Sequence, residues 1–255
     1  MSETGRGETV PFEGEMYLYE QPELLDKEKH GHLGISKVDH PFEFARKAGV
    51  VPIAASEILT VQKYYPVVFS SVESPVLLAA LGVRQDVNLF VDENGEWEKN
   101  TYIPAYLRCH PIAFAMQSND KYAVVIDRAA AVISESPDQP FFDGDELSAQ
   151  TQARVHFFST YDAERERTAV FCARLRDLGL LSGQSAVHRT AAKVEEIASY
   201  VAVDTEKIRN LDKDKLHELH LEGILGAIFG HLFSVENWYR LLERRDYLEE
   251  ARRDF

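Results

Sequence analysis

The sequence predicts an α+β fold, in which a mixed or antiparallel sheet packs against long helices and an extended N-terminal arm precedes them. Short runs of apolar, β-prone residues indicate buried strands at Val67–Phe69 and Tyr122–Asp127. A hairpin pattern spans Leu89–Trp97. Two longer segments, residues 147–181 and the stretch after Asp212, have the apolar spacing that is typical of helices.

The composition is that of a globular chain with an acidic excess. Of its 255 residues 45% are hydrophobic and 27% charged, which allows a substantial buried core. The 42 acidic and 28 basic residues give a formal net charge of -14. Because this charge repels phosphate backbones and anionic surfaces, we expect no nucleic-acid partner. The densest basic cluster, Arg240–Arg253, is interleaved with acidic residues and predicts a solvated helix face.

We expect a cytoplasmic protein without a transmembrane segment. The first residues, Met1–Glu8, contain no apolar run of the kind that a secretory signal needs. The longest uncharged apolar window, Gly223–Gly230, is far shorter than the roughly 20 residues that span a bilayer. Two cysteines, Cys109 and Cys172, indicate neither a disulfide framework nor a cysteine-based metal site.

The chain divides into an arm and one domain. Residues 1–49 are polar and are interrupted by Pro11, Pro22 and Pro41, which predicts an extended arm that packs on the body. Residues 50–255 show no internal repeat and no linker, so they predict a single α+β domain.

Local signals place several smaller elements. Ser56 is suited to cap a short helix that runs through Lys63, because its hydroxyl can accept from amides of the first turn. Residues 76–81 predict another strand, and Asn94–Gly95 tolerates the positive φ of a tight hairpin turn. Residues 190–203 are interpreted as a strand, although part of this segment suits a helix equally well.

The C-terminal part predicts a capped turn followed by one long helix. Asp204 has the residue type of a helix cap, and the long helix begins after Asp212. Small residues recur on one stripe of this helix, which predicts a close approach by another element of the core. The stripe consists of Gly223, Ala227, Gly230 and Ser234.

The segment Trp97–Phe114 combines several aromatic residues with one arginine and is the best candidate for a binding site. Arg108 can bind a carboxylate or phosphate through two parallel hydrogen bonds, while tyrosines shape the pocket around it. Alternatively, Arg108 pairs with an internal acid such as Glu57 or Asp127, and the aromatic residues belong to the core. The candidate ligand-binding residues are Trp97, Tyr102, Tyr106, Arg108, His110, Glu57 and Asp127.

No complete catalytic or metal-binding pattern is present in the sequence. His217 and His220 are three residues apart, but they lack the His-Glu-x-x-His arrangement of a zinc hydrolase. His231 is predicted to be a buried histidine that bonds to the backbone or to an acid. The sequence also has no nucleophile elbow, phosphate loop or dinucleotide fingerprint. We therefore assign no catalytic residue, no metal and no cofactor.

Several short motifs occur in a fixed order along the chain from about Met16 to Arg245. They include Tyr65–Phe69, Asn88–Asp92, Gly95–Trp97, Tyr102–Arg108, Tyr200–Asp204 and Gly230–Ser234. With these motifs the chain resembles the SapC-like family, bacterial proteins named after a surface-layer-associated protein. The resemblance departs at Cys109–Phe114, where the family pattern would be aromatic and more basic.

The resemblance implies a cytosolic chain, linked to the cell surface or to outer-membrane uptake systems, from a family for which no general catalytic activity is established. Two functions are compatible with it. The first is a non-catalytic binding or accessory protein for a peptide or protein partner, which contacts the surface around Arg108. The second is an enzyme acting on a peptide or amino-acid-like carboxylate, with Arg108 as anchor and Glu57, Asp127 or His110 in acid–base roles. The sequence leaves a homo-oligomer open.

Overall fold

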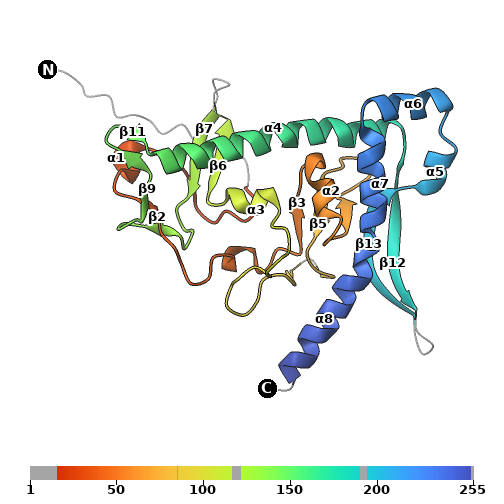
Figure 1. Ribbon diagram of the computed structural model, residues 1–255, viewed down its shortest axis with the longest axis horizontal. Coiled ribbons are helices and arrows are strands. Elements are labelled where there is room, and N and C mark those ends of the chain that lie inside the picture. Colours follow the sequence, from red (N-terminus) through yellow and green to blue (C-terminus); the bar gives the residue numbers. More distant parts are fainter. Residues whose placement is uncertain (1–15, 85, 117–121, 190–193, 254–255) are drawn as a thin grey trace. The chain divides into compact units, whose positions relative to one another are not determined.

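The chain forms two compact units, and helices and strands occur throughout its length (Figure 1). The first unit contains the residues up to Val38 together with Cys109–Phe158, and the second contains Asp39–Arg108 and Ser159–Phe255. Helices and antiparallel strands occur together along the chain, which confirms the α+β class. The structure is a computed structural model that describes residues 16–84, 86–116, 122–189 and 194–253.

The first unit is built on two small antiparallel sheets. Strand β7 forms the centre of one sheet, in the order β1-β7-β6, and β2 forms the centre of the other, in the order β8-β2-β9. The first sheet consists of β1 (Pro22–Leu24), β6 (Ile112–Met116) and β7 (Tyr122–Asp127). The second consists of β2 (Gly34–Ile35), β8 (Ile133–Ser134) and β9 (Gln139–Pro140). The predicted strand at Tyr122–Asp127 is confirmed.

Residues from the predicted N-terminal arm take part in this unit. The arm contributes β1, β2 and the short helix α1 (Lys27–His30), while residues 1–15 lie outside the described part. A further hairpin joins β10 (Phe142–Asp143) to β11 (Glu146–Leu147). The division into an arm and one domain at residue 49 stays a prediction. The buried core of the unit consists of Leu33, Ile35, Ile112, Ile126 and Phe141.

The second unit is organised around a five-stranded antiparallel sheet, ordered β12-β13-β4-β5-β3. The predicted strands at Val67–Phe69 and within residues 76–81 are confirmed. Residues 194–203 form a strand rather than a helix, and residues 190–193 of that prediction lie outside the described part. The strands are β3 (Val50–Pro52), β4 (Val67–Phe69), β5 (Leu77–Ala80), β12 (Leu181–Arg189) and β13 (Val194–Val203).

Most predicted helices are present, although their ends differ. Helix α4 (Ala149–Asp177) confirms the helical period of residues 147–181, but Leu181 already begins β12. The short turns and helices before it are η1 (Glu43–Ala45), η2 (Ala55–Glu57), α2 (Ile58–Val61) and α3 (Ala105–Cys109). Within the described residues, no helix combines the length and the hydropathy that crossing a bilayer requires.

The prediction of a single long helix after Asp212 was wrong, because three helices occupy this region. They are α6 (Lys213–Leu221), α7 (Ile224–Ser234) and α8 (Asn237–Arg253). Gly223 separates the first two with a φ of 73°, a left-handed conformation that glycine adopts without strain. The preceding short helix, α5 (Thr205–Arg209), begins as predicted, since the Asp204 side chain accepts from the amides of Glu206 and Lys207.

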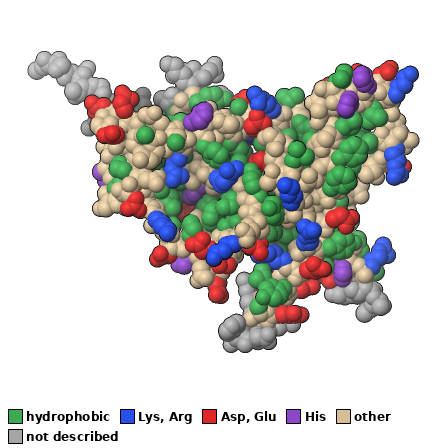
Figure 2. Space-filling model, viewed as in Figure 1, with side chains coloured by type: hydrophobic (Ala, Val, Ile, Leu, Met, Phe, Trp, Pro, Cys, Tyr) green, Lys and Arg blue, Asp and Glu red, His purple; other side chains and the backbone are tan. Residues whose placement is uncertain are grey.

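Helix α7 has one buried and one exposed face. On the buried face the Ser234 hydroxyl accepts a hydrogen bond of 2.8 Å from the Val67 amide of β4. On the exposed face Phe229 and Phe233 lie one turn apart, with ring centroids separated by 6.4 Å. Figure 2 shows hydrophobic side chains at the surface over this helix. The predicted small-residue stripe therefore serves packing at Gly230 and Ser234, whereas Gly223 ends a helix.

Substitution of the two glycines of α7 is expected to have opposite effects. A Cβ at Gly230 would lie 2.6 Å from Cγ2 of the buried Ile58 in α2, so Gly230→Ala should cost about 1–3 kcal/mol of stability. At Gly226 an added Cβ has no atom within 4 Å. Gly226→Ala should therefore stabilise the helix by up to about 1 kcal/mol. Urea unfolding of both variants checks this, and equal effects would contradict the close approach of α2 and α7.

Candidate functional site

Three of the predicted site residues form one chain of hydrogen bonds in the second unit. Arg108, at the end of α3, is exposed and donates from Nη2 to the hydroxyl of Tyr102 over 2.9 Å. Its guanidinium carbon lies 5.3 Å from the centroid of the Tyr102 ring. The Tyr102 hydroxyl in turn donates to Glu57 Oε1 over 3.0 Å. Tyr102 thus lies between the exposed cation and the buried carboxylate.

The Glu57 carboxylate is occupied by donors from its own fold. Oε2 accepts from the Ala54 amide over 2.8 Å, and Oε1 accepts from the Ala105 amide over 2.8 Å as well as from Tyr102. Glu57, rather than Ser56, therefore caps the short helical turn, because the Ser56 side chain is exposed. This carboxylate connects η2 to the start of α3.

Tyr102 remains protonated at neutral pH. Its burial, followed by the negative charge of Glu57, raises the pKa of the Tyr102 phenol to about 12, although Arg108 acts in the opposite direction. A protonated phenol donates to Glu57 and can accept from Arg108. The arrangement orients Arg108. Because the phenol keeps its proton near pH 7, the phenolate that could act as a general base does not form there.

The aromatic members of the predicted site belong largely to the packing of the second unit. Trp97 is 6% exposed, and its indole Nε1 donates to Thr101 Oγ1 over 2.9 Å. Its ring stacks on Phe90 with centroids 6.1 Å apart. Tyr106 is half-buried, and its ring lies 6.2 Å from that of Tyr161.

The two remaining predicted residues, His110 and Asp127, form a pair in the first unit. His110 Nε2 lies 3.2 Å from Asp127 Oδ2, and because a carboxylate only accepts, the ring nitrogen is the donor. The Tyr19 ring packs edge-on against His110 with centroids 5.2 Å apart. Asp127 also accepts from the amides of Glu20 and Gln21.

These hydrogen bonds hold Asp127 in its ionised form. Burial by itself would raise the pKa of the carboxyl, but the hydrogen bonds from His110 and from the amides of Gln21 and Glu20 outweigh it and lower the pKa to about 2. A carboxylate with this pKa and these partners is a poor proton acceptor at neutral pH. Its contacts fasten residues 20 and 21 to the end of β7.

A second feature of the second unit lies in the segment before α3. The predicted Asn94–Gly95 turn forms, but the arms beside it are reduced to one bridge between Val91 and Trp97. Of the two turn residues, Gly95 has a positive φ, of 67°, and the Asp92 carbonyl accepts from its amide. We call residues 89–99 the hairpin segment.

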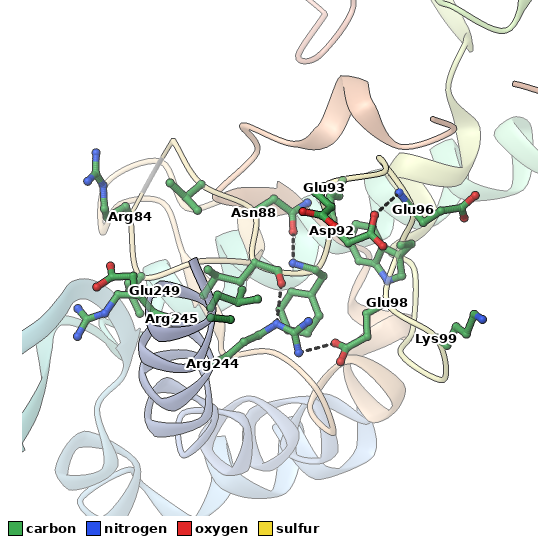
Figure 3. A pocket seen from close by; sticks show the side chains of 18 residues that line it. Arg84, Asn88, Asp92, Glu93, Glu96, Glu98, Lys99, Arg244, Arg245 and Glu249 are labelled. Carbon is green, nitrogen blue, oxygen red and sulfur yellow. Dashed lines mark hydrogen bonds and ion pairs between the residues drawn. The ribbon is translucent and has the colours of Figure 1, made fainter. Parts of the chain in front are cut away.

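Helix α8 packs against the hairpin segment through Arg244 (Figure 3). Arg244 Nε donates to the Leu89 carbonyl over 2.6 Å, and its guanidinium carbon lies 4.5 Å from the centroid of the Phe90 ring. Nη1 lies 2.6 Å from Glu98 Oε2, an ion pair without the alignment of a hydrogen bond. One side chain thus contacts three residues of the hairpin segment.

A pocket of about 1260 Å³ lies between residues 83–99 and α8. It is larger than most small-molecule sites, which occupy roughly 300–1,000 Å³. Buried apolar residues such as Leu89 and Val91 form part of its wall, and half-buried Leu248 approaches from α8. Figure 3 shows acidic and basic side chains around it. Among the predicted site residues, Trp97 lines this pocket.

The sequence did not reveal the contribution of α8. Arg244, Arg245 and Glu249 follow a pattern of opposite charges one turn apart, which predicted a solvated face. A local pattern carries no information on Leu89, which lies 155 residues before its partner Arg244. The sequence signal that could have indicated a contact of this helix was the apolar Leu248 within the charged segment.

The histidines of the C-terminal helices do not converge. Within the part of the chain that the structure describes, no group of three or more His, Cys, Asp or Glu side chains is arranged to hold a metal ion. His231 is buried, and its ring bonds to the backbone of β4 and β13, as predicted for a core histidine.

Comparison with known proteins gives one match. The family model described as SapC matches residues 25–241. No curated protein and no solved structure matches the chain.

Proposed function

We propose that this chain, which belongs to the SapC family, is a cytoplasmic, non-catalytic protein that binds a peptide or a segment of a protein partner. The family model matches residues 25–241. The observation that carries this proposal is the pocket of about 1260 Å³ between residues 83–99 and α8. Its size suits several consecutive residues better than one metabolite. In this proposal the partner contacts Trp97, which lines the pocket and is one of the candidate ligand-binding residues from the sequence.

The state of the candidate acids and bases supports binding over catalysis. Glu57 accepts three hydrogen bonds from its own fold. Asp127 has a pKa of about 2 and Tyr102 one of about 12, so neither exchanges a proton readily near pH 7. A general acid or base needs a pKa near the working pH.

The exposed guanidinium of Arg108 supports a second candidate, an enzyme that anchors a peptide or amino-acid-like carboxylate. Its hydrogen bond to Tyr102 fixes the direction of the guanidinium, and fixed donors suit a carboxylate. In this alternative Arg108 binds the carboxylate of the ligand beside Tyr102, and Glu57 is the nearest carboxylate along the same chain of hydrogen bonds.

A peptide-binding experiment distinguishes the two. Random dodecapeptides are selected on the immobilised protein, and the winners are measured by fluorescence anisotropy with free and with amidated C-termini. Leu248→Trp introduces a larger and more rigid side chain into the pocket from α8 and is expected to weaken binding by at least about tenfold. Leu221→Trp is the matched control, since Leu221 is exposed on α6 and does not line the pocket. It is expected to bind as the wild type does.

The Arg108 candidate predicts a different result. Arg108→Gln would then abolish binding, amidation of the peptide would do the same, and Leu248→Trp would have no effect. If the wild type selects no peptide, or if Leu248→Trp and Leu221→Trp bind equally well, the pocket is not the peptide site.

A further inference from the structure

The basic side chains around the pocket are mostly neutralised by the protein itself. Lys99 is the exception, since its ammonium group has no ion pair among the described residues. The paired cations are Arg84 with Asp86 at 3.1 Å, Arg244 with Glu98 at 2.6 Å and Arg245 with Asp246 at 2.7 Å.

The acidic side chains of the lining are mostly not neutralised. Glu93, Glu96 and Glu249 are exposed, and in the described part of the chain their carboxylates have neither an ion pair nor a hydrogen bond. Asp92 accepts only from backbone amides, those of Asn94 and Glu96. After internal pairing, the pocket of this acidic chain therefore keeps an excess of negative charge, which favours a cationic ligand.

Backbone groups of the hairpin segment form a second, independent feature. In the bridge between Val91 and Trp97 the hydrogen bonds run from Asp92 to Glu96 and from Glu98 to Phe90. In such a pair the N–H and C=O groups of Val91 and Trp97 point away from each other, toward the outer edges. Within the described residues no hydrogen bond to these backbone groups is found.

Unpaired backbone groups at the edge of a strand are a template for pairing with another extended segment. Val91 and Trp97 both line the pocket. An extended peptide that adds a strand to one of these edges would pair with the backbone groups of the residue on that edge. Side chains of such a strand alternate between two faces, so every second one could meet the apolar wall.

We infer that the partner is an extended peptide segment with alternating apolar and basic residues, which pairs with the hairpin edge and directs lysine or arginine side chains toward Glu93, Glu96 and Glu249. This inference rests on the proposed function, since it specifies which peptide the pocket binds. The unpaired backbone groups of the hairpin edge favour a peptide in extended conformation, and the unpaired carboxylates favour basic side chains on that peptide.

Three synthetic peptides test the charge preference. The basic probe is Gly-(Lys-Val)₃-Gly, and its two counterparts have Gln or Glu in place of Lys. By fluorescence anisotropy with the full chain, the basic peptide is expected to bind at least about tenfold more tightly than the Gln peptide. The Glu peptide is expected not to bind. The preference should weaken as salt is raised, because exposed charges are screened.

A matched pair of triple variants localises the preference. Glu93→Gln/Glu96→Gln/Glu249→Gln is expected to bring the Lys and Gln peptides within about twofold of each other. The control Glu28→Gln/Glu73→Gln/Glu135→Gln removes the same net charge at exposed positions outside the lining, and should keep the full preference. If both variants lose the preference equally, overall charge causes it, and the assignment to these three carboxylates is overturned.

A backbone-modified peptide tests the strand addition. N-methylation of the valines removes the donors of one peptide edge, whereas N-methylation of the lysines removes those of the other. One modification is expected to weaken binding at least about tenfold and the other to have little effect. Equal tolerance of both overturns the strand pairing.

Failures of the two proposals can be told apart. If the Gln or Glu peptide binds as tightly as the basic one and Leu248→Trp abolishes that binding, the proposed peptide site stands and the charge inference fails. If none of the three peptides binds, and random selection also yields none, both fail.

Discussion

Glu57→Ala is expected to lower the free energy of unfolding by about 3–5 kcal/mol. The substitution removes the acceptor of the Ala54 and Ala105 amides and of the Tyr102 hydroxyl. Two of these donors are backbone N–H groups in the buried interior, and each unpaired donor costs about 1–3 kcal/mol. Urea unfolding, with the midpoint and slope compared to wild type, measures the loss.

Glu57→Gln and Ser56→Ala provide the controls for this prediction. Glu57→Gln keeps the shape, but its amide nitrogen would face either the Ala54 N–H or the two donors at Oε1, so an intermediate loss is expected. Ser56→Ala is expected to stay within about 0.5 kcal/mol, because the exposed serine does not cap the turn. A large loss for Ser56→Ala with a small one for Glu57→Ala would reverse the assignment.

His231→Leu is expected to cost about 3 kcal/mol at pH 7. The Val203 amide donates to His231 Nε2 over 3.1 Å, so Nδ1 carries the proton and donates to the Val67 carbonyl over 2.8 Å. This neutral ring connects β4 to β13, which are paired directly only at Val201 and Phe69. Leucine fills the space but leaves the Val67 carbonyl and the Val203 amide unpaired.

The same histidine gives the wild-type protein a distinct pH dependence. Burial lowers the pKa of His231 to about 4, although its bond to Val67 acts in the opposite direction. The unfolded chain takes up this proton near pH 6.5, so the stabilisation is complete above that pH and is lost as the pH falls toward 4. The loss by pH 5 is on the order of 2 kcal/mol.

Unfolding measured between pH 5 and pH 7 tests this linkage. The stability gap between wild type and His231→Leu should narrow toward pH 5, because the variant lacks the titrating ring. Gly226→Ala, which changes no titratable group, should keep a constant gap to wild type. A gap for His231→Leu that does not change with pH would show that the ring titrates alike in the folded and unfolded chains.

Elements specified by local pattern were predicted from the sequence. Val67–Phe69 and Tyr122–Asp127 are continuous apolar runs, and both are strands. Asp204 caps a helix through amides two and three residues away, so its residue type was sufficient. His231 was assigned to the core because eleven residues of the predicted helix separate it from His220, too far for the two to share a metal ion, and its backbone bonds confirm this.

Features specified by distant partners were not predicted. Ser56 has the residue type of a cap, but Glu57 takes that role because it also reaches Ala105, 48 residues away. In the sequence, Gly223 is compatible both with a packing stripe on one long helix and with a break between two helices. Its φ of 73° shows that it separates two helices. The wall of the pocket depends on Arg244 meeting Leu89, a pairing that no spacing rule contains.

The candidate site was predicted in part. Glu57, Tyr102 and Arg108 do lie together, since α3 brings Arg108 back beside the Tyr102 hydroxyl, which bonds to Glu57. His110 and Asp127 meet each other instead, within the other unit. Sequence proximity suggested one cluster, although the boundary between the units falls between Arg108 and Cys109.

The contacts of Asp127 have a consequence for which sequences this fold tolerates. The carboxylate recognises amide hydrogens at Glu20, Gln21 and Ala129, and their side chains are not involved. Every amino acid except proline offers the same hydrogen. The chemical requirement therefore falls on Asp127 and on its side-chain donor His110, while positions 20 and 21 are free to vary among residues other than proline as long as the chain follows the same path.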